Sequence, residues 1–236
     1  MDIYYIILVL PAVLLALIAQ GFVKSTFRKY NAVHSHRNIT GAEAARQVLD
    51  AHGLTHVAVG KVAGDLTDHY DPRSNTIFLS TSTHDSTSVA AIGVAAHEAG
   101  HAIQHDVQYF PIQVRSAIIP ATNIGSKLSV PLIILGLFLS SVAQDFILLA
   151  ELGVICFGLS TLFQLVTCPV EFNASHRALE TLKGTGMLDE DELPKARKVL
   201  SAAALTYVAA LAVSAMQLLR FVLIVAGAKG GSKKRR

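Results

Sequence analysis

The chain has 236 residues, of which 52% are hydrophobic and only 16% are charged. With a mean hydropathy of +0.46, this composition excludes an ordinary soluble globular protein and indicates a membrane protein. The net charge is +3, and the basic residues lie beside apolar segments and at the C-terminus. Because that distribution suits the anionic surface of a bilayer, we expect a lipid partner and no nucleic acid.

Four apolar segments divide the chain. A helix needs about 20 residues to cross the hydrocarbon core. Residues 3–23 reach that length without a convincing cleavage site, so they are predicted to form a transmembrane anchor. Residues 118–166 hold two apolar runs around a polar break at 143–145, which predicts a transmembrane hairpin. Residues 202–228 are predicted to be a C-terminal membrane helix, followed by a basic tail at 229–236.

The hairpin fixes which segments share a compartment. It returns the chain to the side it left, so residues 24–127 and 167–201 are expected to face the same side. The basic tail argues against a cytoplasmic location for that side. The basic residues near the membrane ends favour it, namely Lys24, Arg28, Lys29, Lys127 and Arg177. Under this topology Glu151 and Arg220 lie at similar depth in the membrane, so we expect them to pair.

Residues 24–117 begin with a short α+β pattern. Thr-Gly-Ala-Glu at 40–43 is a capping box, which predicts a helix that ends near Gly53. Valines within 57–62 predict a strand, and residues 76–80 predict a second strand, which we expect at the edge of the sheet. The segment between them, around 68–72, is expected to be a turn.

A further helix, predicted from residue 86 or 88 to about 106, carries the sequence His-Glu-Ala-Gly-His at 97–101. On an α-helix, positions i and i+4 share a face, so both imidazoles can bind one ion. Glu98 then projects beside that ion, where its carboxylate can take a proton from an activated water. This spacing predicts one Zn²⁺ with His97 and His101 as ligands and Glu98 as the catalytic base.

The third ligand is less clear from the residues. A catalytic zinc usually takes three protein ligands and keeps one position for water. His105 is nearest, but it lies about 12 Å along the helix axis from His97, so it is expected to be either a neighbour of the ligands or a surface residue. Pro169 is expected to kink or break the chain, so that Glu171 begins a helix at the membrane surface. Glu171 is equally well interpreted as a ligand or as a solvated carboxylate favoured by the helix dipole.

The motif at 97–101, taken with Glu171 and Ser175, resembles the pattern of the HtpX-like membrane proteases, a gluzincin arrangement. The chain also resembles the YugP-like neutral zinc metallopeptidases over most of its length. The short motifs that carry this resemblance lie at residues 68–73, 79–80 and 95–105. This resemblance implies that His97, His101 and Glu171 bind zinc and that Glu98 is the general base. HtpX-like sequences have an aspartate where Ser175 stands, so the resemblance leaves open which residue orients a ligand histidine.

Several side chains are candidates for the supporting roles. Ser175, His176 and Asp71 are candidates for orienting a ligand histidine, and His105 is a candidate neighbour of the ion. A donor for the oxyanion is also expected, and the candidates are Tyr207, His176, Arg177, His69 and Tyr70.

Together these features predict a mainly α-helical membrane protein with about four transmembrane helices and a small α+β, zincin-like catalytic portion at 24–117. Residues 167–201 would supply the third-ligand helix and a connector. The expected activity is zinc-dependent endopeptidase cleavage of proteins near the membrane surface, on the cytoplasmic side of a bacterial plasma membrane. The alternatives are a non-catalytic membrane scaffold with a structural zinc and, with less support, a transporter.

Overall fold

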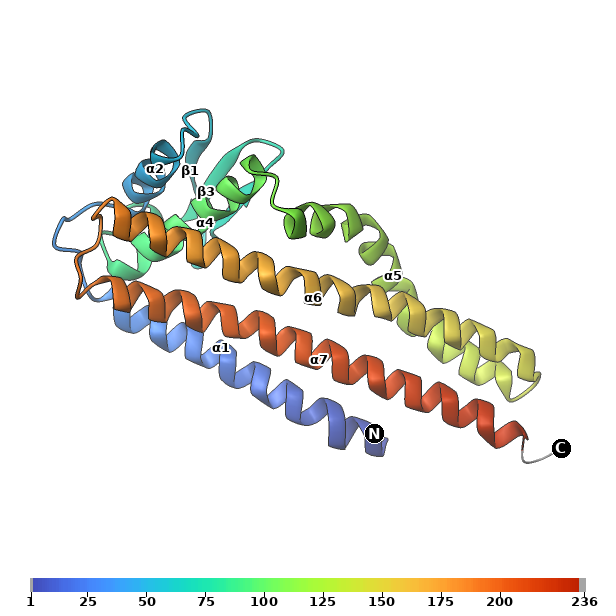
Figure 1. Cartoon of the computed structure of the whole chain (residues 1–236). Helices are drawn as coiled ribbons and strands as arrows, with labels where there is room; N and C mark the ends of the chain where they lie inside the picture. The colour runs from blue at the N-terminus through green and yellow to red at the C-terminus, as the bar shows by residue number, and fades with distance from the viewer. Residues whose placement is uncertain (1, 234–236) are drawn as a thin grey trace. The chain divides into compact units, whose positions relative to one another are not determined.

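The computed structural model describes residues 2–233 and divides into two compact units (Figure 1). The helical unit comprises Met1–Ile18, Val114–Cys168 and Tyr207–Arg236. The α+β unit comprises Ala19–Gln113 and Pro169–Thr206. The expected basic tail at 229–236 lies partly outside the described residues, since the last helix is described to Lys233.

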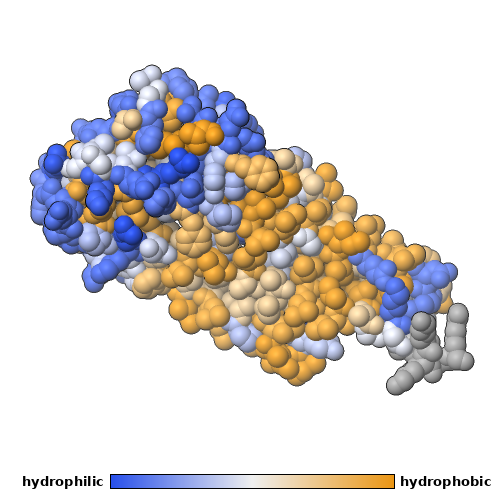
Figure 2. All heavy atoms as spheres, in the orientation of Figure 1, coloured by the Kyte–Doolittle hydropathy of each residue, from blue (hydrophilic) through white to orange (hydrophobic). Residues whose placement is uncertain are grey.

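Long helices contribute residues to both units, and their bounds are α1 (Leu10–Asn31), α5 (Phe110–Ser140), α6 (Ile147–Gly184) and α7 (Leu193–Lys233). A π-helical turn, η1 (Tyr5–Val9), precedes α1, and a 3-10 turn, η2 (Gln144–Phe146), precedes α6. Within residues 2–233, four helices are long and apolar enough to cross a membrane, which confirms the expected number. At most 22% of the most apolar stretch of each helix is buried. The exposed apolar side chains, orange in Figure 2, therefore suit a lipid solvent.

Charged side chains in the helical unit pair differently from the expectation. Arg220 binds Asp2, with Nε 3.0 Å from Oδ2, whereas Glu151 accepts a hydrogen bond from Lys229 at 2.6 Å. The predicted pairing of Glu151 with Arg220 is therefore wrong. A similar depth of Glu151 and Arg220 in the membrane did not suffice to predict their pairing. Asp2 is the partner of Arg220, and Lys229 is the partner of Glu151.

Helix α6 also differs from the expectation, because it runs through Pro169 without a break. Proline removes one backbone hydrogen bond, but helices built from membrane segments tolerate this loss when neighbouring groups compensate. Glu171 consequently lies inside a long helix and not at a helix start. The interpretation of Glu171 as a solvated carboxylate at a helix N-terminus no longer applies, since its side chain is buried.

The α+β unit follows the predicted order of elements closely: α2 (Gly41–Ala51), β1 (Ala58–Val62), β2 (His69–Asp71), β3 (Thr76–Ser80), α3 (Thr81–His84) and α4 (Val89–Asp106). The strands form one sheet in the order β1-β3-β2, with β1 parallel and β2 antiparallel to β3. Strand β3 is therefore central, and its prediction as an edge strand is wrong. The segment expected to be only a turn supplies one of the two edge strands of this sheet, β2.

Helix starts in this unit are fixed by side chains close in sequence. The Thr40 hydroxyl accepts the Glu43 N–H, and the Glu43 carboxylate accepts the Thr40 N–H in return. Ser88 caps α4 by accepting the Ala91 N–H at 3.1 Å. The core then forms where α2, α4 and β3 pack together with residues from the end of α6 and the start of α7. This packing sets the position of α4, the helix that carries the histidine motif.

Candidate metal centre

The α4 and α6 helices approach each other closely beside the motif. A Cβ atom at Gly100 would lie 2.5 Å from the carbonyl oxygen of Ala174 on α6, a distance that no side chain can occupy. Gly100 therefore permits a helix separation that any other residue would prevent. This close approach brings α6 within reach of the two histidines of α4.

Three potential ligand atoms converge at this point. Oε2 of Glu171 lies 3.3 Å from Nε2 of His97 and 3.5 Å from Nε2 of His101, and all three side chains are largely buried. Two ligands that each lie about 2.0–2.1 Å from a tetrahedral ion are about 3.3 Å apart. The observed separations therefore match those of ligands that share one ion, and two imidazoles with a carboxylate are a donor set that zinc accepts.

The far nitrogens of both imidazoles are also bound. Nδ1 of His97 lies 3.0 Å from Oγ of Ser175, and Nδ1 of His101 lies 3.0 Å from Oε1 of Gln104. Such outer contacts orient ligand histidines in metal sites and fix their tautomers. Ser175 lies one turn after Glu171 on α6, so the same helix supplies a candidate ligand and a candidate orienting group.

The fully buried side chain of Gln104 forms hydrogen bonds to His101 and to two residues of α6. Its amide nitrogen donates to the carbonyl oxygen of Val170 at 2.7 Å and to Oδ1 of Asn173 at 3.0 Å. Two acceptors around the nitrogen turn the amide oxygen toward His101. Because an amide oxygen only accepts, Nδ1 of His101 must carry the proton, which leaves the lone pair of Nε2 for a metal. Gln104 was not among the predicted site residues, although its i+3 spacing from His101 was the available signal.

The metal-free centre also perturbs proton binding at His101. Burial disfavours the charged imidazole, but the hydrogen bond and charge of Glu171 outweigh it, so the pKa of His101 is raised. The charge of Glu98 raises the pKa of His101 further. Glu98 itself is buried on α4, next to His97 in sequence. A centre with this electrostatic character favours a bound cation.

The structure gives the following surroundings for three other predicted residues. His176 is exposed and forms an ion pair with Glu180 at 3.2 Å. Tyr207 belongs to the helical unit. The ring of His105 lies 5.5 Å from that of Tyr70, one helical turn beyond His101.

The remaining candidates support local structure in the α+β unit. Arg177 donates from Nε to Oδ1 of Asn173 at 2.8 Å, and so contacts the Gln104 network indirectly. His69 stacks on Phe78 with ring centroids 5.2 Å apart. The Asp71 carboxylate accepts the N–H of Arg73 at 3.0 Å, as expected of a residue in a turn.

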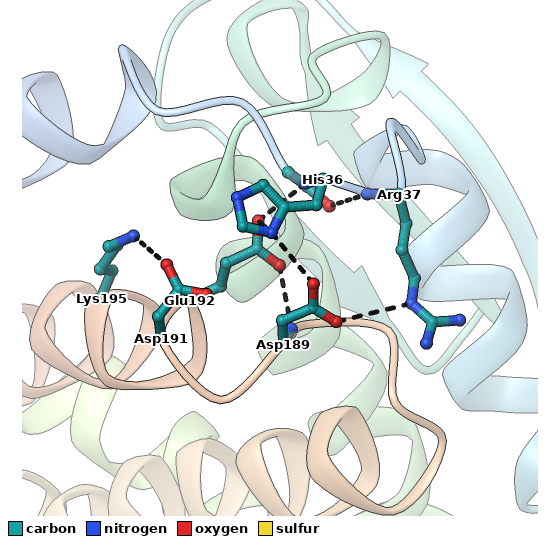
Figure 3. Close-up of polar contacts among 7 residues, drawn as sticks. His36, Arg37, Asp189, Asp191, Glu192 and Lys195 are labelled. Carbon is teal, nitrogen blue, oxygen red and sulfur yellow. Dashed lines mark hydrogen bonds and ion pairs between the residues drawn. The ribbon is translucent and has the colours of Figure 1, made fainter.

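A second group of potential ligands lies where the turn before α7 meets the segment before α2 (Figure 3). Its members are His36, Asp189 and Glu192. The two oxygens of the buried Glu192 accept the backbone N–H groups of His36 and Asp189, at 2.8 and 2.9 Å. Nδ1 of His36 donates to Oδ2 of Asp189 at 3.0 Å, and this hydrogen bond raises the pKa of the imidazole. Since both Glu192 oxygens already bind the backbone, this cluster joins two segments and caps a helix.

A buried His-His-Glu donor set, with a second glutamate beside it on the same helix, is typical of zinc-dependent hydrolases. Residues 5–226 match the family described as "Putative neutral zinc metallopeptidase", and the chain belongs to this family of membrane proteins. It is 45% identical over 220 residues to the "Putative membrane protease YugP" of Bacillus subtilis (strain 168). That alignment covers 93% of this chain and 96% of the relative. No solved structure matches the chain.

Proposed function

We propose that the chain is a membrane-bound endopeptidase whose zinc is held by His97, His101 and Glu171. The observation that carries this proposal is the convergence of three side-chain atoms. Oε2 of Glu171 lies 3.3 Å from Nε2 of His97 and 3.5 Å from Nε2 of His101. The hydrogen bond from His101 to Gln104 supports it, because it leaves Nε2 available as a ligand. Membership of a zinc metallopeptidase family points to the same chemistry.

The roles of the protein groups follow from their positions. Bound zinc would supply a Lewis acid that polarises a peptide carbonyl and acidifies water. The Glu98 carboxylate accepts the proton of the attacking water and then transfers it to the departing amine. Ser175 and Gln104 hold the two imidazoles in place during this cycle, so that little reorganisation is needed when charge develops.

The free edge of the sheet supports binding of an extended peptide. An added strand can pair with β2, the edge strand that contacts α4. A pocket of about 150 Å³ lies between these elements, and its lining includes Tyr70, Ala102 and His105. We infer that it receives a substrate side chain one helical turn beyond His101. Because the third ligand belongs to a membrane helix, the substrates would be protein segments near the bilayer surface, on the cytoplasmic side that the basic residues favour.

Glu98→Gln in the full-length protein tests this function. The variant should keep its zinc and lose at least about a hundredfold in cleavage of unfolded membrane-protein segments, because the amide cannot accept the proton. Glu180→Gln, on the exposed face of α6, serves as the control and should retain activity. Unchanged cleavage by Glu98→Gln would remove the proposed general base. Zinc without any cleavage in the wild type would favour a structural zinc in a scaffold.

A further inference from the structure

A pocket of about 530 Å³ lies between the C-terminal half of α1 and the first turns of α7. All of its lining residues belong to the α+β unit. The helices are held together beside it by Phe27 and Tyr30 of α1, which pack with Val199 of α7 and Ala90 of α4. The pocket is of the size of small-molecule sites, and its walls are fixed by this cluster.

The pocket is positively charged. Lys29, Arg197 and Lys198 line it, their side chains are exposed, and no acidic residue is among its described lining residues. Within residues 2–233, none of the three forms an ion pair within 4.0 Å. Lys195 is different, because its ammonium binds Asp191 at 2.8 Å. The pocket therefore presents cations whose charge the surrounding protein does not neutralise.

Its other walls change from polar to apolar along the helices. Hydroxyl groups of Ser25, Thr26 and Ser201 lie among the cations, whereas Phe22 and Leu205 are apolar and about half exposed. The apolar run of α1 ends near Phe22, and that of α7 begins near Leu205. On both helices, the pocket thus lies at the level where membrane-type sequence gives way to charged sequence.

We propose that this pocket binds an anionic phospholipid of the bilayer. The three cations and the hydroxyls would bind the phosphate and headgroup, while the acyl chains lie along Phe22 and Leu205. A basic pocket between membrane helices, at the level of the headgroups, is suited to such a lipid. Because the adjoining cluster includes Ala90, a bound lipid would also stabilise α4 against α1 and α7. The site is separate from the proposed metal centre and does not depend on its activity.

Lipid binding to the purified full-length protein in detergent tests the proposal by native mass spectrometry. The probes are palmitoyl-oleoyl phosphatidylglycerol, phosphatidylcholine with the same chains, and glycerol 3-phosphate. The wild type should retain one phosphatidylglycerol with about tenfold preference over phosphatidylcholine. Lys29→Gln/Arg197→Gln should lower that affinity about tenfold, since each basic residue near a membrane surface contributes substantially to anionic lipid binding. Lys24→Gln/Arg28→Gln removes the same charges from exposed positions of α1 outside the pocket, and should retain the preference.

A second variant separates shape from charge. Ser201→Phe fills the pocket but leaves its three cations, and it should also abolish the retained lipid. The melting temperature of each variant reports whether the protein is folded. Equal loss in the two double variants would show general surface attraction and overturn the proposal. Retention of the lipid by Ser201→Phe would overturn it as well. Full competition by glycerol 3-phosphate at equal concentration would assign the pocket to a soluble phosphate ester instead of a lipid.

Discussion

The amide oxygen of Gln104 lies 3.0 Å from Nδ1 of His101, while its amide nitrogen binds two acceptors on α6. One buried side chain therefore sets the tautomer of a histidine on α4 and joins α4 to the helix that carries Glu171. The proposed centre depends on this contact as well as on the three ligand atoms.

Replacement of Gln104 tests that dependence. Gln104→Met keeps the side-chain volume but removes the acceptor for His101 and the donor to Val170. We expect zinc affinity to fall about 10- to 100-fold, as for other outer contacts of metal ligands. Chelator competition on detergent-purified protein measures this change. Gln47→Met, on the exposed face of α2, is the matched control and should bind zinc as the wild type does. An unchanged affinity in Gln104→Met would show that the contact is dispensable.

The close approach of α4 and α6 makes a separate prediction at Gly100. In Gly100→Ala, the new methyl group meets the Ala174 carbonyl oxygen at 2.5 Å, so the helices must move apart. We expect a loss of about 1–3 kcal/mol in stability, typical of overpacking, and lower zinc occupancy. Gly158→Ala on α6, where a Cβ meets nothing within 4 Å, should leave both unchanged. Thermal unfolding and metal analysis measure the two effects, and full zinc occupancy in Gly100→Ala would contradict the account.

Local sequence patterns predicted the elements of the α+β unit well. The capping box of Thr40 and Glu43 and the capping residue Ser88 act within one helical turn, so their effect is visible in the sequence alone. The motif spacing placed His97 and His101 on one face for the same reason. Features that depend on i to i+4 contacts were therefore accessible without a structure.

Long-range pairing was not accessible in this way. Strand order depends on hydrogen bonds between distant segments, so β3 was wrongly expected at an edge and β2 was missed. Pro169 was expected to kink or break the chain because proline removes a local hydrogen bond, but α6 continues through it. The contact of Glu171 with both histidines likewise joins positions about 70 residues apart, and the residues alone left its role open.

The His36 cluster predicts a pH effect on stability. Its hydrogen bond to Asp189 raises the pKa of His36 above the ordinary value of 6.5. The protonated imidazole therefore stabilises the folded state fully below about pH 6.5, and this contribution is lost as pH rises through the raised pKa. His36→Gln should lower the melting temperature more at pH 6 than at pH 8. His56→Gln, also exposed, is the control, and an equal effect of His36→Gln at both pH values would contradict the prediction.

Zinc stoichiometry tests the central claim most directly. The wild-type protein, purified in detergent, should hold one zinc per chain. Glu171→Ala should lose most of it, because Oε2 of Glu171 is the only carboxylate oxygen in the proposed three-ligand set. Glu180→Ala, on the exposed side of the same helix, should keep it. If Glu171→Ala retains one zinc with unchanged affinity, the third ligand lies elsewhere and the proposed centre is wrong.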